Sequence, residues 1–141
     1  DLRIATPEST LGIPIARTLG NCLSGATCSR LVDLLGPALA KDMLFTGRFI
    51  DGTEALARGL VTRLEPADAI DRAVEALATQ IAAHAPLTLR ATKEMIRRVM
   101  AQRRLAAGED RDLIAMCYNS NDFREGVNAF LSKRAPKWTG T

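Results

Sequence analysis

Apolar residues recur at helical spacing through the second half of the chain. The first stripe lies before Pro86 and is typical of an amphipathic helix. Further helices are predicted over residues 87–105 and 109–118, and a last one is expected to begin at Ser120 or Asn121, either of which can cap it. The residues expected on the buried faces of the first two helices are Ile70, Val74, Leu77, Ile81, Ile96, Val99 and Met100.

The first 66 residues instead alternate short apolar segments with glycine and proline. Residues 2–6 and 60–64 are rich in Leu, Ile, Val and Thr, which predicts two short strands. Helices are predicted from residue 24 or 25 to residue 35 and over residues 37–45, because Gly36 lies where a glycine commonly ends a helix. The pattern as a whole predicts a little β structure followed by a run of helices.

Composition limits the classes of protein that fit this pattern. The 141 residues are 47% hydrophobic and 25% charged, which is ordinary for a globular chain. Aromatic residues make up only 4%, so we expect a core built mainly from Ala, Leu, Ile, Val and Met. The formal net charge of +3 is too small to indicate a nucleic-acid partner.

Cysteine and histidine usage gives no sign of a disulfide framework or a metal site. The three cysteines, Cys22, Cys28 and Cys117, are odd in number and form no CxxC motif, and His84 has no partner at ligand spacing. The sequence contains no apolar run of bilayer length and no signal-peptide pattern, so no membrane partner is expected. A cytoplasmic protein is therefore predicted.

The first residues of the chain have the pattern of a β-strand, with no turn or loop before it. We interpret this as the sign of a longer protein, of which the chain is the C-terminal half. Strands that have lost their sheet neighbours leave unpaired edges. We therefore expect residues 1–23 to be poorly ordered or paired with another copy of the chain.

Six segments in sequence order resemble the enoyl-CoA hydratase/isomerase (crotonase) superfamily. The last is the most specific, because it closely resembles the long pattern D-x-x-E-G-x-x-A-F-x-E-K-R-x-P. The first is similar to D-[IL]-R-[IV]-A and the second to F-G-x-P-E. The six segments are residues 1–5 (DLRIA), 11–15 (LGIPI), 44–48 (LFTGR), 54–61 (EALARGLV), 85–94 (APLTLRATKE) and 122–136 (DFREGVNAFLSKRAP).

The resemblance implies an α/β crotonase-like (ClpP/crotonase) fold. Residues 1–66 would form the end of the ββα spiral core, and residues 67–141 a C-terminal helical region for trimerisation and CoA contact. The family binds acyl-CoA thioesters as homotrimers or hexamers. It needs no cofactor, because coenzyme A is part of the substrate.

Catalysis in this family depends on two backbone N–H groups that bind the thioester oxyanion, and on two glutamates in the hydratases. The resemblance places both N–H groups and one glutamate in segments that precede Asp1. Losing one oxyanion donor typically costs about a hundred- to a thousand-fold in rate. The other glutamate is the last residue of F-G-x-P-E, and Ile15 occupies that position. Because isoleucine cannot exchange a proton, acid–base catalysis from Ile15 is excluded.

Three polar side chains in the loop of residues 20–27 are candidate replacements. Asn21, Cys22 or Ser24 could orient a water or the substrate there. The alternative is structural: Asn21 and Ser24 cap the following helix, and Cys22 packs as a small hydrophobic residue.

Two residues match family positions near coenzyme A. Phe130 would lie near the adenine and Lys133 near the phosphates, where an ammonium acts as a point charge. The alternatives are a core position for Phe130 and a solvated terminus for Lys133.

Glu94 and Glu125 are expected to form ion pairs, for Glu94 with Arg90 and Arg98.

The sequence leaves three functions open. The first is an acyl-CoA enzyme of the hydratase/isomerase type, present as a C-terminal segment that is inactive alone. The second is a helical oligomerisation module without chemistry. The third is a divergent acyl-CoA binder that lacks hydratase activity because of Ile15.

Overall fold

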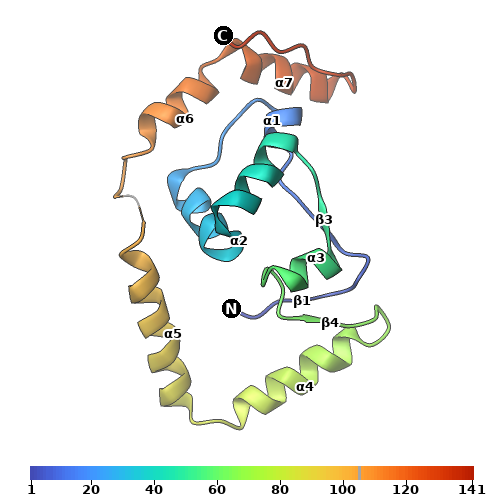
Figure 1. Cartoon of the computed structure of the whole chain (residues 1–141), viewed down its shortest axis with the longest axis vertical. Helices are drawn as coiled ribbons and strands as arrows, with labels where there is room; N and C mark the ends of the chain where they lie inside the picture. Colours follow the sequence, from blue (N-terminus) through green and yellow to red (C-terminus); the bar gives the residue numbers. More distant parts are fainter. Residues whose placement is uncertain (105) are drawn as a thin grey trace. The chain divides into compact units, whose positions relative to one another are not determined.

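The computed structural model describes residues 1–104 and 106–141, which form short strands and a series of helices (Figure 1). The chain divides into two compact units. Unit 1 contains residues 1–10 and 51–104; unit 2 contains residues 11–50 and the described residues from 106 to 141. The mostly helical content, with short strands near the N-terminus, is as predicted.

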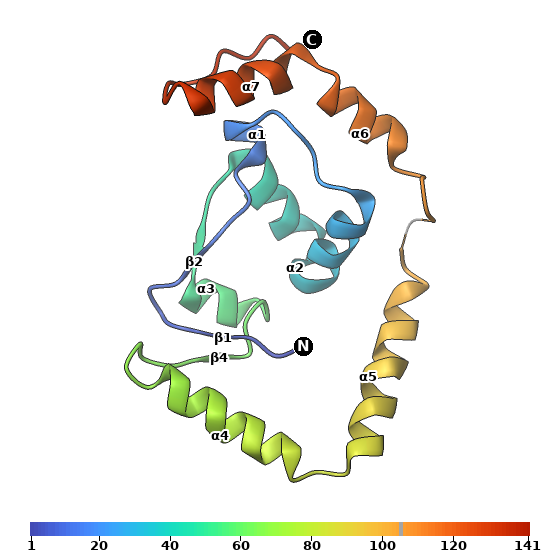
Figure 2. The ribbon, with the colours of Figure 1, turned by 180° about the vertical axis from the view of Figure 1, so that it is seen from behind.

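Unit 1 is built on a parallel strand pair. β1 (Ile4–Ala5) pairs with β4 (Arg63–Leu64), and Figure 2 shows the two side by side. The N–H of Thr62 donates to the carbonyl of Arg3 at 2.8 Å and extends this ladder. The first strand therefore has a partner within the chain, because β4 returns beside it.

The segment between these strands fits closely against the chain start. α3 (Gly52–Ala57) begins at Asp51, whose carboxylate accepts a hydrogen bond from the N–H of Glu54 at 2.7 Å. The N–H of Gly52 donates to the carbonyl of Pro7 at 3.1 Å. A Cβ atom at Gly52 would lie 2.1 Å from the carbonyl oxygen of Thr6, so only glycine fits there.

The two long helices of unit 1 differ in how far their apolar faces are covered. α4 (Ile70–Ala82) has three residues of its predicted stripe, Val74, Leu77 and Ile81, in a groove shared with β1. α5 (Pro86–Ala101) is not covered: its predicted buried face is wrong for this chain, because Ile96 is 59% exposed. The predicted end of that helix, Leu105, lies outside the described residues.

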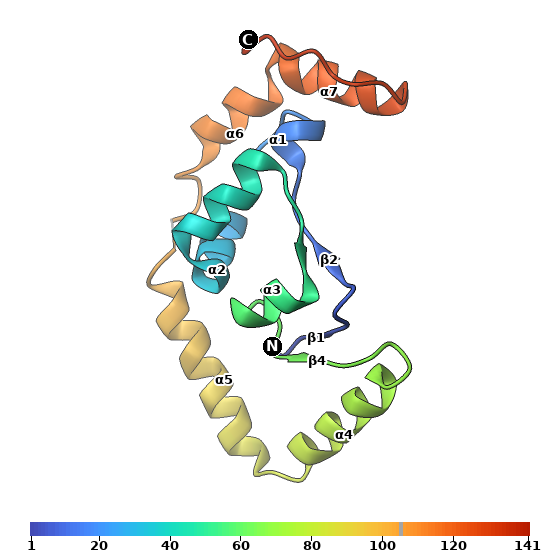
Figure 3. The same ribbon diagram turned by 45° about the vertical axis from the view of Figure 1, so that its right-hand side comes forward.

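In unit 2, the long helix α2 (Gly25–Thr46) consists of two helical parts, as Figure 3 shows. The break is at Gly36, whose φ of 72° is the left-handed conformation that glycine adopts without a Cβ clash. Two helices meeting at Gly36 are what the sequence predicts. Before α2 lie β2 (Thr10–Leu11), which pairs with β3 (Ile50–Asp51), and α1 (Ile15–Thr18).

The C-terminal helices of unit 2 are α6 (Arg111–Tyr118) and α7 (Asn121–Leu131). Ser120 caps α7 by accepting a hydrogen bond from the N–H of Phe123 at 3.0 Å, as predicted. α7 lies against the backbone after α1, and a Cβ atom at Gly126 would be 2.3 Å from the carbonyl oxygen of Leu19. Ala129, one turn further, is fully buried.

Candidate functional site

A cavity of about 350 Å³ lies within unit 2. Its wall is contributed by α1, the loop that follows it, α2 and the segment at the start of α6. Most of the lining is apolar. The lining residues are Ile15, Ala16, Asn21, Cys22, Leu23, Gly25, Cys28, Leu44, Phe45, Asp110 and Leu113.

This cavity brings together sequence segments that the family resemblance singles out. Ile15, the first residue of α1, stands at the expected glutamate position and lines the cavity. Asn21 and Cys22, from the candidate loop, line it as well. The third loop candidate, Ser24, is not among the lining residues.

Ser24 has the structural role that was considered for it. Its hydroxyl accepts a hydrogen bond from the N–H of Thr27 at 3.3 Å and caps α2. It also lies 3.0 Å from the Thr27 hydroxyl. The Ser24 hydroxyl is thus occupied at the helix terminus.

Asn21 does not cap α2, contrary to the structural alternative. Its side-chain Nδ2 donates to the Tyr118 hydroxyl at 3.2 Å, which ties the loop to the end of α6. Its Oδ1 is buried and accepts no hydrogen bond within the described residues. A buried acceptor without a donor is costly, and such atoms in a cavity are available to a ligand that carries a donor.

Cys22 lies among groups that keep its thiol protonated. Its Sγ donates to the carbonyl of Leu113 at 3.6 Å. Burial raises the pKa of the Cys22 thiol to about 11, and the Cys117 thiol and the charge of Asp110 add to the rise. Because the nucleophilic form of cysteine is the thiolate, Cys22 is not an activated nucleophile at neutral pH.

Asp110 is the residue of the cavity that the sequence did not suggest. It is the N-terminal flanking residue of α6 and is half-buried. Its Oδ2 accepts a hydrogen bond from the N–H of Gly25 at 2.6 Å. Nothing in the local sequence around Asp110 distinguishes it from a solvated turn, so only its contact with α2 reveals it.

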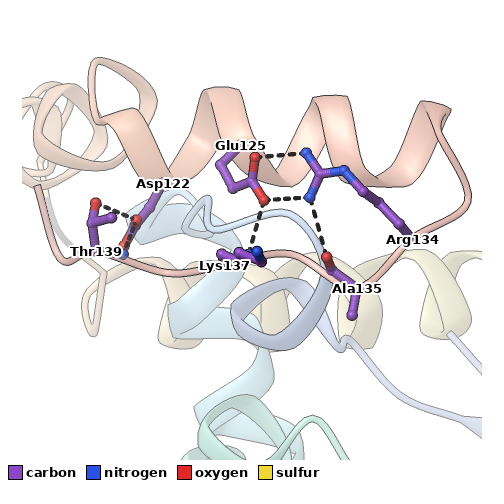
Figure 4. Close-up of polar contacts among 6 residues, drawn as sticks. All are labelled: Asp122, Glu125, Arg134, Ala135, Lys137 and Thr139. Atoms are coloured by element: carbon purple, nitrogen blue, oxygen red, sulfur yellow. Dashed lines mark hydrogen bonds and ion pairs between the residues drawn. The ribbon is translucent and has the colours of Figure 1, made fainter.

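The C-terminal tail is held against α7 by two carboxylates (Figure 4). Glu125 binds the Arg134 guanidinium in a bidentate ion pair, with N–O distances of 2.5 and 2.8 Å, and accepts the N–H of Lys137 at 2.9 Å. Asp122 accepts the N–H groups of Thr139 and Gly140 at 2.6 and 2.9 Å. The expected ion pair of Glu125 therefore exists, but it fixes the tail rather than its own helix.

These contacts lower the pKa values of the two carboxylates of α7. The Arg134 guanidinium, followed by the Lys137 N–H, lowers the pKa of Glu125 to about 2. The Thr139 N–H is the main cause of the lowered pKa of Asp122. Glu94 of α5 has a similarly lowered pKa of about 2, caused by Arg97 and Arg98, of which the sequence suggested only Arg98.

We expect acid to release the tail from α7. Because the pKa of Glu125 is lower in the folded state than its unfolded value of about 4.5, its contacts stabilise the folded tail fully above that pH. This stabilisation is lost as the pH falls through about 2. Trp138, the single tryptophan, lies in this tail, so its fluorescence should change over that range. Glu125→Gln should bring the change to neutral pH, whereas the control Glu94→Gln, in unit 1, should not. If the Trp138 fluorescence at neutral pH is the same in wild type and Glu125→Gln, Glu125 does not hold the tail against α7.

The two residues expected near coenzyme A lie at the end of α7. Phe130 is 68% exposed, so the alternative of a core position is wrong for this chain. Lys133 is exposed and has a φ of 52°, in the left-handed region. The N–H of Lys133 donates to Phe130 and that of Arg134 to Ala129, the Schellman pattern that ends many helices.

Two searches of the described residues bear on other kinds of site. No group of three or more His, Cys, Asp or Glu side chains that could hold a metal ion occurs within residues 1–104 and 106–141. None of the helices in that part of the chain combines the length and the hydropathy needed to cross a bilayer.

Comparison with known proteins identifies relatives of the whole chain. The enoyl-CoA hydratase/isomerase family profile matches residues 1–141. The human mitochondrial enoyl-CoA hydratase domain-containing protein 2 is 38% identical over 148 residues, which cover 99% of this chain and 49% of that protein. A short-chain-enoyl-CoA hydratase of Clostridioides difficile is 37% identical over 132 residues, covering 92% of this chain and 84% of that one.

Solved structures also resemble the chain. Methylmalonyl-CoA decarboxylase in complex with 2-nitronate-propionyl-CoA superposes with a TM-score of 0.92 at 28% identity, over 100% of this chain and 55% of that one. The chain thus spans about half the length of most of these proteins. The crotonase fold expected from the sequence is confirmed. The chain belongs to the enoyl-CoA hydratase/isomerase (crotonase) family.

Proposed function

We propose that this chain forms the acyl-binding part of an acyl-CoA enzyme of the hydratase/isomerase type. The observation that carries the proposal is the cavity of unit 2, because Ile15 and the loop residues Asn21 and Cys22 line it together. Ile15 stands at the position of the family's catalytic glutamate, and Asn21 and Cys22 are candidate replacements for it. The volume of about 350 Å³ lies within the range typical of small-molecule sites.

The chemistry of the lining supports an acyl occupant. Leu23, Leu44, Phe45 and Leu113 offer apolar surface, and burying each methylene of a ligand there contributes about 0.8 kcal/mol. Ile15 adds to this apolar wall in place of a proton-exchanging group. We therefore propose a site that binds acyl-CoA thioesters and does not use the usual glutamate for hydration.

Other parts of the proposed site are not in this cavity. The oxyanion donors of the family belong to segments that are not in residues 1–141, so we propose that this chain alone is inactive and that activity belongs to the complete protein. Phe130 and Lys133 would contact the adenine and phosphates of coenzyme A. Their exposure at the end of α7 leaves them accessible for that contact.

Binding of thioesters by the complete natural protein tests this proposal. Hexanoyl-CoA should bind roughly 200-fold more tightly than acetyl-CoA, from four additional methylenes in the cavity. Cys28→Phe should abolish most of that difference by filling the cavity. The control Ala26→Phe, at an exposed position on the first turn of α2, should retain it. Equal affinities for the two thioesters in the wild-type protein would contradict the proposal.

An assembly role is the second candidate, and the uncovered face of α5 favours it. Ile96 and Val99, three residues apart on that face, are 59% and 55% exposed, which is unusual for a folded surface helix. We propose that this face contacts further copies in a homotrimer or hexamer. Sedimentation of the 141-residue chain tests the role: a trimer that Ile96→Glu dissociates would support it, and a monomer at all concentrations would count against it.

A further inference from the structure

Asp110 gives the apolar cavity of unit 2 a single charge. Among the described residues that line the cavity, it is the only Asp, Glu, Lys, Arg or His. Half-burial beside apolar side chains weakens the solvent screening of that charge. An acyl group in the cavity would therefore experience a negative field.

The N-terminus of α2 offsets this charge only in part. The N–H of Gly25 donates to Oδ2 of Asp110 at 2.6 Å, and a helix N-terminus carries about half a positive charge. No donor within residues 1–104 and 106–141 reaches the other carboxylate oxygen, Oδ1. A full negative charge beside about half a positive one leaves the cavity with a net negative potential.

A second hydrogen-bond acceptor in the cavity acts in the same direction. Asn21 lines the cavity, and its Oδ1 is buried with no donor among the described residues. One of the two hydrogens on its Nδ2 is donated to the Tyr118 hydroxyl. The Oδ1 atom thus adds an unpaired acceptor, which suits a ligand donor or a positive charge and repels an anion.

We propose that Asp110 makes this cavity selective for uncharged or positively charged acyl groups and against acyl groups that end in a carboxylate. The inference rests on the proposed acyl-binding function and adds the substrate class. A ligand carboxylate about 6 Å from Asp110, at an effective dielectric constant of about 20, would be disfavoured on the order of 100-fold.

A pair of saturated thioesters tests this selectivity without turnover. Hexanoyl-CoA and adipyl-CoA have the same chain length and differ in the terminal carboxylate. The complete natural protein should bind hexanoyl-CoA at least about 100-fold more tightly than adipyl-CoA. Asp110→Asn should reduce that ratio by roughly tenfold or more, mainly through tighter adipyl-CoA binding.

The Asp110→Asn variant removes the charge without removing the hydrogen bond to α2. Its amide oxygen can still accept the Gly25 N–H, so the contact with α2 is retained. Asp112→Asn is the matched control, because it removes the same charge at an exposed position of α6 that does not line the cavity. This control should leave the affinity ratio unchanged. A general effect of removing one negative charge would instead alter the ratio in both variants alike.

Each outcome has a distinct meaning. An unchanged ratio in Asp110→Asn, or an equal shift in Asp112→Asn, would overturn the inference while leaving the acyl-binding function intact. If Asp110→Asn does not fold, the wild-type ratio still decides, because equal affinities for the two thioesters exclude selection against the carboxylate. Failure of the cavity to distinguish hexanoyl-CoA from acetyl-CoA would instead overturn the proposed function itself.

Discussion

Gly126→Ala is expected to destabilise unit 2 by about 3 kcal/mol. The new methyl group would lie 2.3 Å from the carbonyl oxygen of Leu19 and 2.6 Å from its carbonyl carbon. Both are backbone atoms, so the contact cannot be relieved by a side-chain rotation. α7 would have to move away from the segment after α1, and Ala129, which is fully buried on the same helix, would lose packing. Urea unfolding followed by circular dichroism measures the change.

The sign of this effect makes the prediction specific. At an unconstrained helix position, replacing glycine by alanine stabilises by about 1 kcal/mol. Asn128→Ala, at an exposed position of α7, is the control and should be neutral or slightly stabilising. A Gly126→Ala variant as stable as wild type would show that α7 does not rest on Leu19.

Ile15→Glu is expected to raise crotonyl-CoA hydration by the complete natural protein about 100-fold. The new carboxylate would enter the cavity that Asp110 also lines. Two carboxylates in one apolar site repel each other, which raises the pKa of one of them. Such a group can carry a proton between the water and the substrate near neutral pH. The initial rate of crotonyl-CoA consumption measures the gain.

Two further variants separate proton transfer from a change of shape. Ile15→Gln has nearly the same size as Ile15→Glu but cannot exchange a proton at neutral pH, so it should show no gain. Ile15→Glu combined with Asp110→Asn should retain only part of the gain if the two carboxylates act together. Equal rates for the glutamate and glutamine variants would contradict acid–base catalysis from this position.

The helical architecture was largely predictable because its local signals agree with one another. Gly36 breaks α2 where a glycine was expected to end a helix, and Ser120 caps α7 as its position predicted. The closing motif of the family also gains a physical explanation. Asp122 and Glu125 hold the tail, and Gly126 permits the approach to Leu19.

The errors arose where the outcome depends on contacts between distant segments. Pairing of β1 with β4 joins residues that are far apart in sequence, and no local pattern encodes it. The stripe of α5 was correctly recognised as apolar, but periodicity does not show whether the chain itself covers that face. Ile96 remains exposed because no described element of unit 1 covers it.

The sequence predicted which segments line the candidate cavity, but it did not predict the chemistry of the lining. Family motifs led to Ile15 and the loop that contains Asn21 and Cys22, and all three line one cavity. Asp110 was missed because its role depends on a single hydrogen bond to Gly25, which only the folded chain brings within reach. Cys22 had the residue type of a nucleophile, and its surroundings make it an inert thiol.

Crotonyl-CoA hydration by the unmodified complete protein, measured beside hexanoyl-CoA binding on the same preparation, is the most direct test of the account. We propose that this family member binds acyl-CoA thioesters in a cavity where Ile15 replaces the proton-exchanging glutamate. We therefore expect hexanoyl-CoA binding together with hydration about 100-fold slower than that of Ile15→Glu. Hydration by the unmodified protein as fast as that of Ile15→Glu would contradict it.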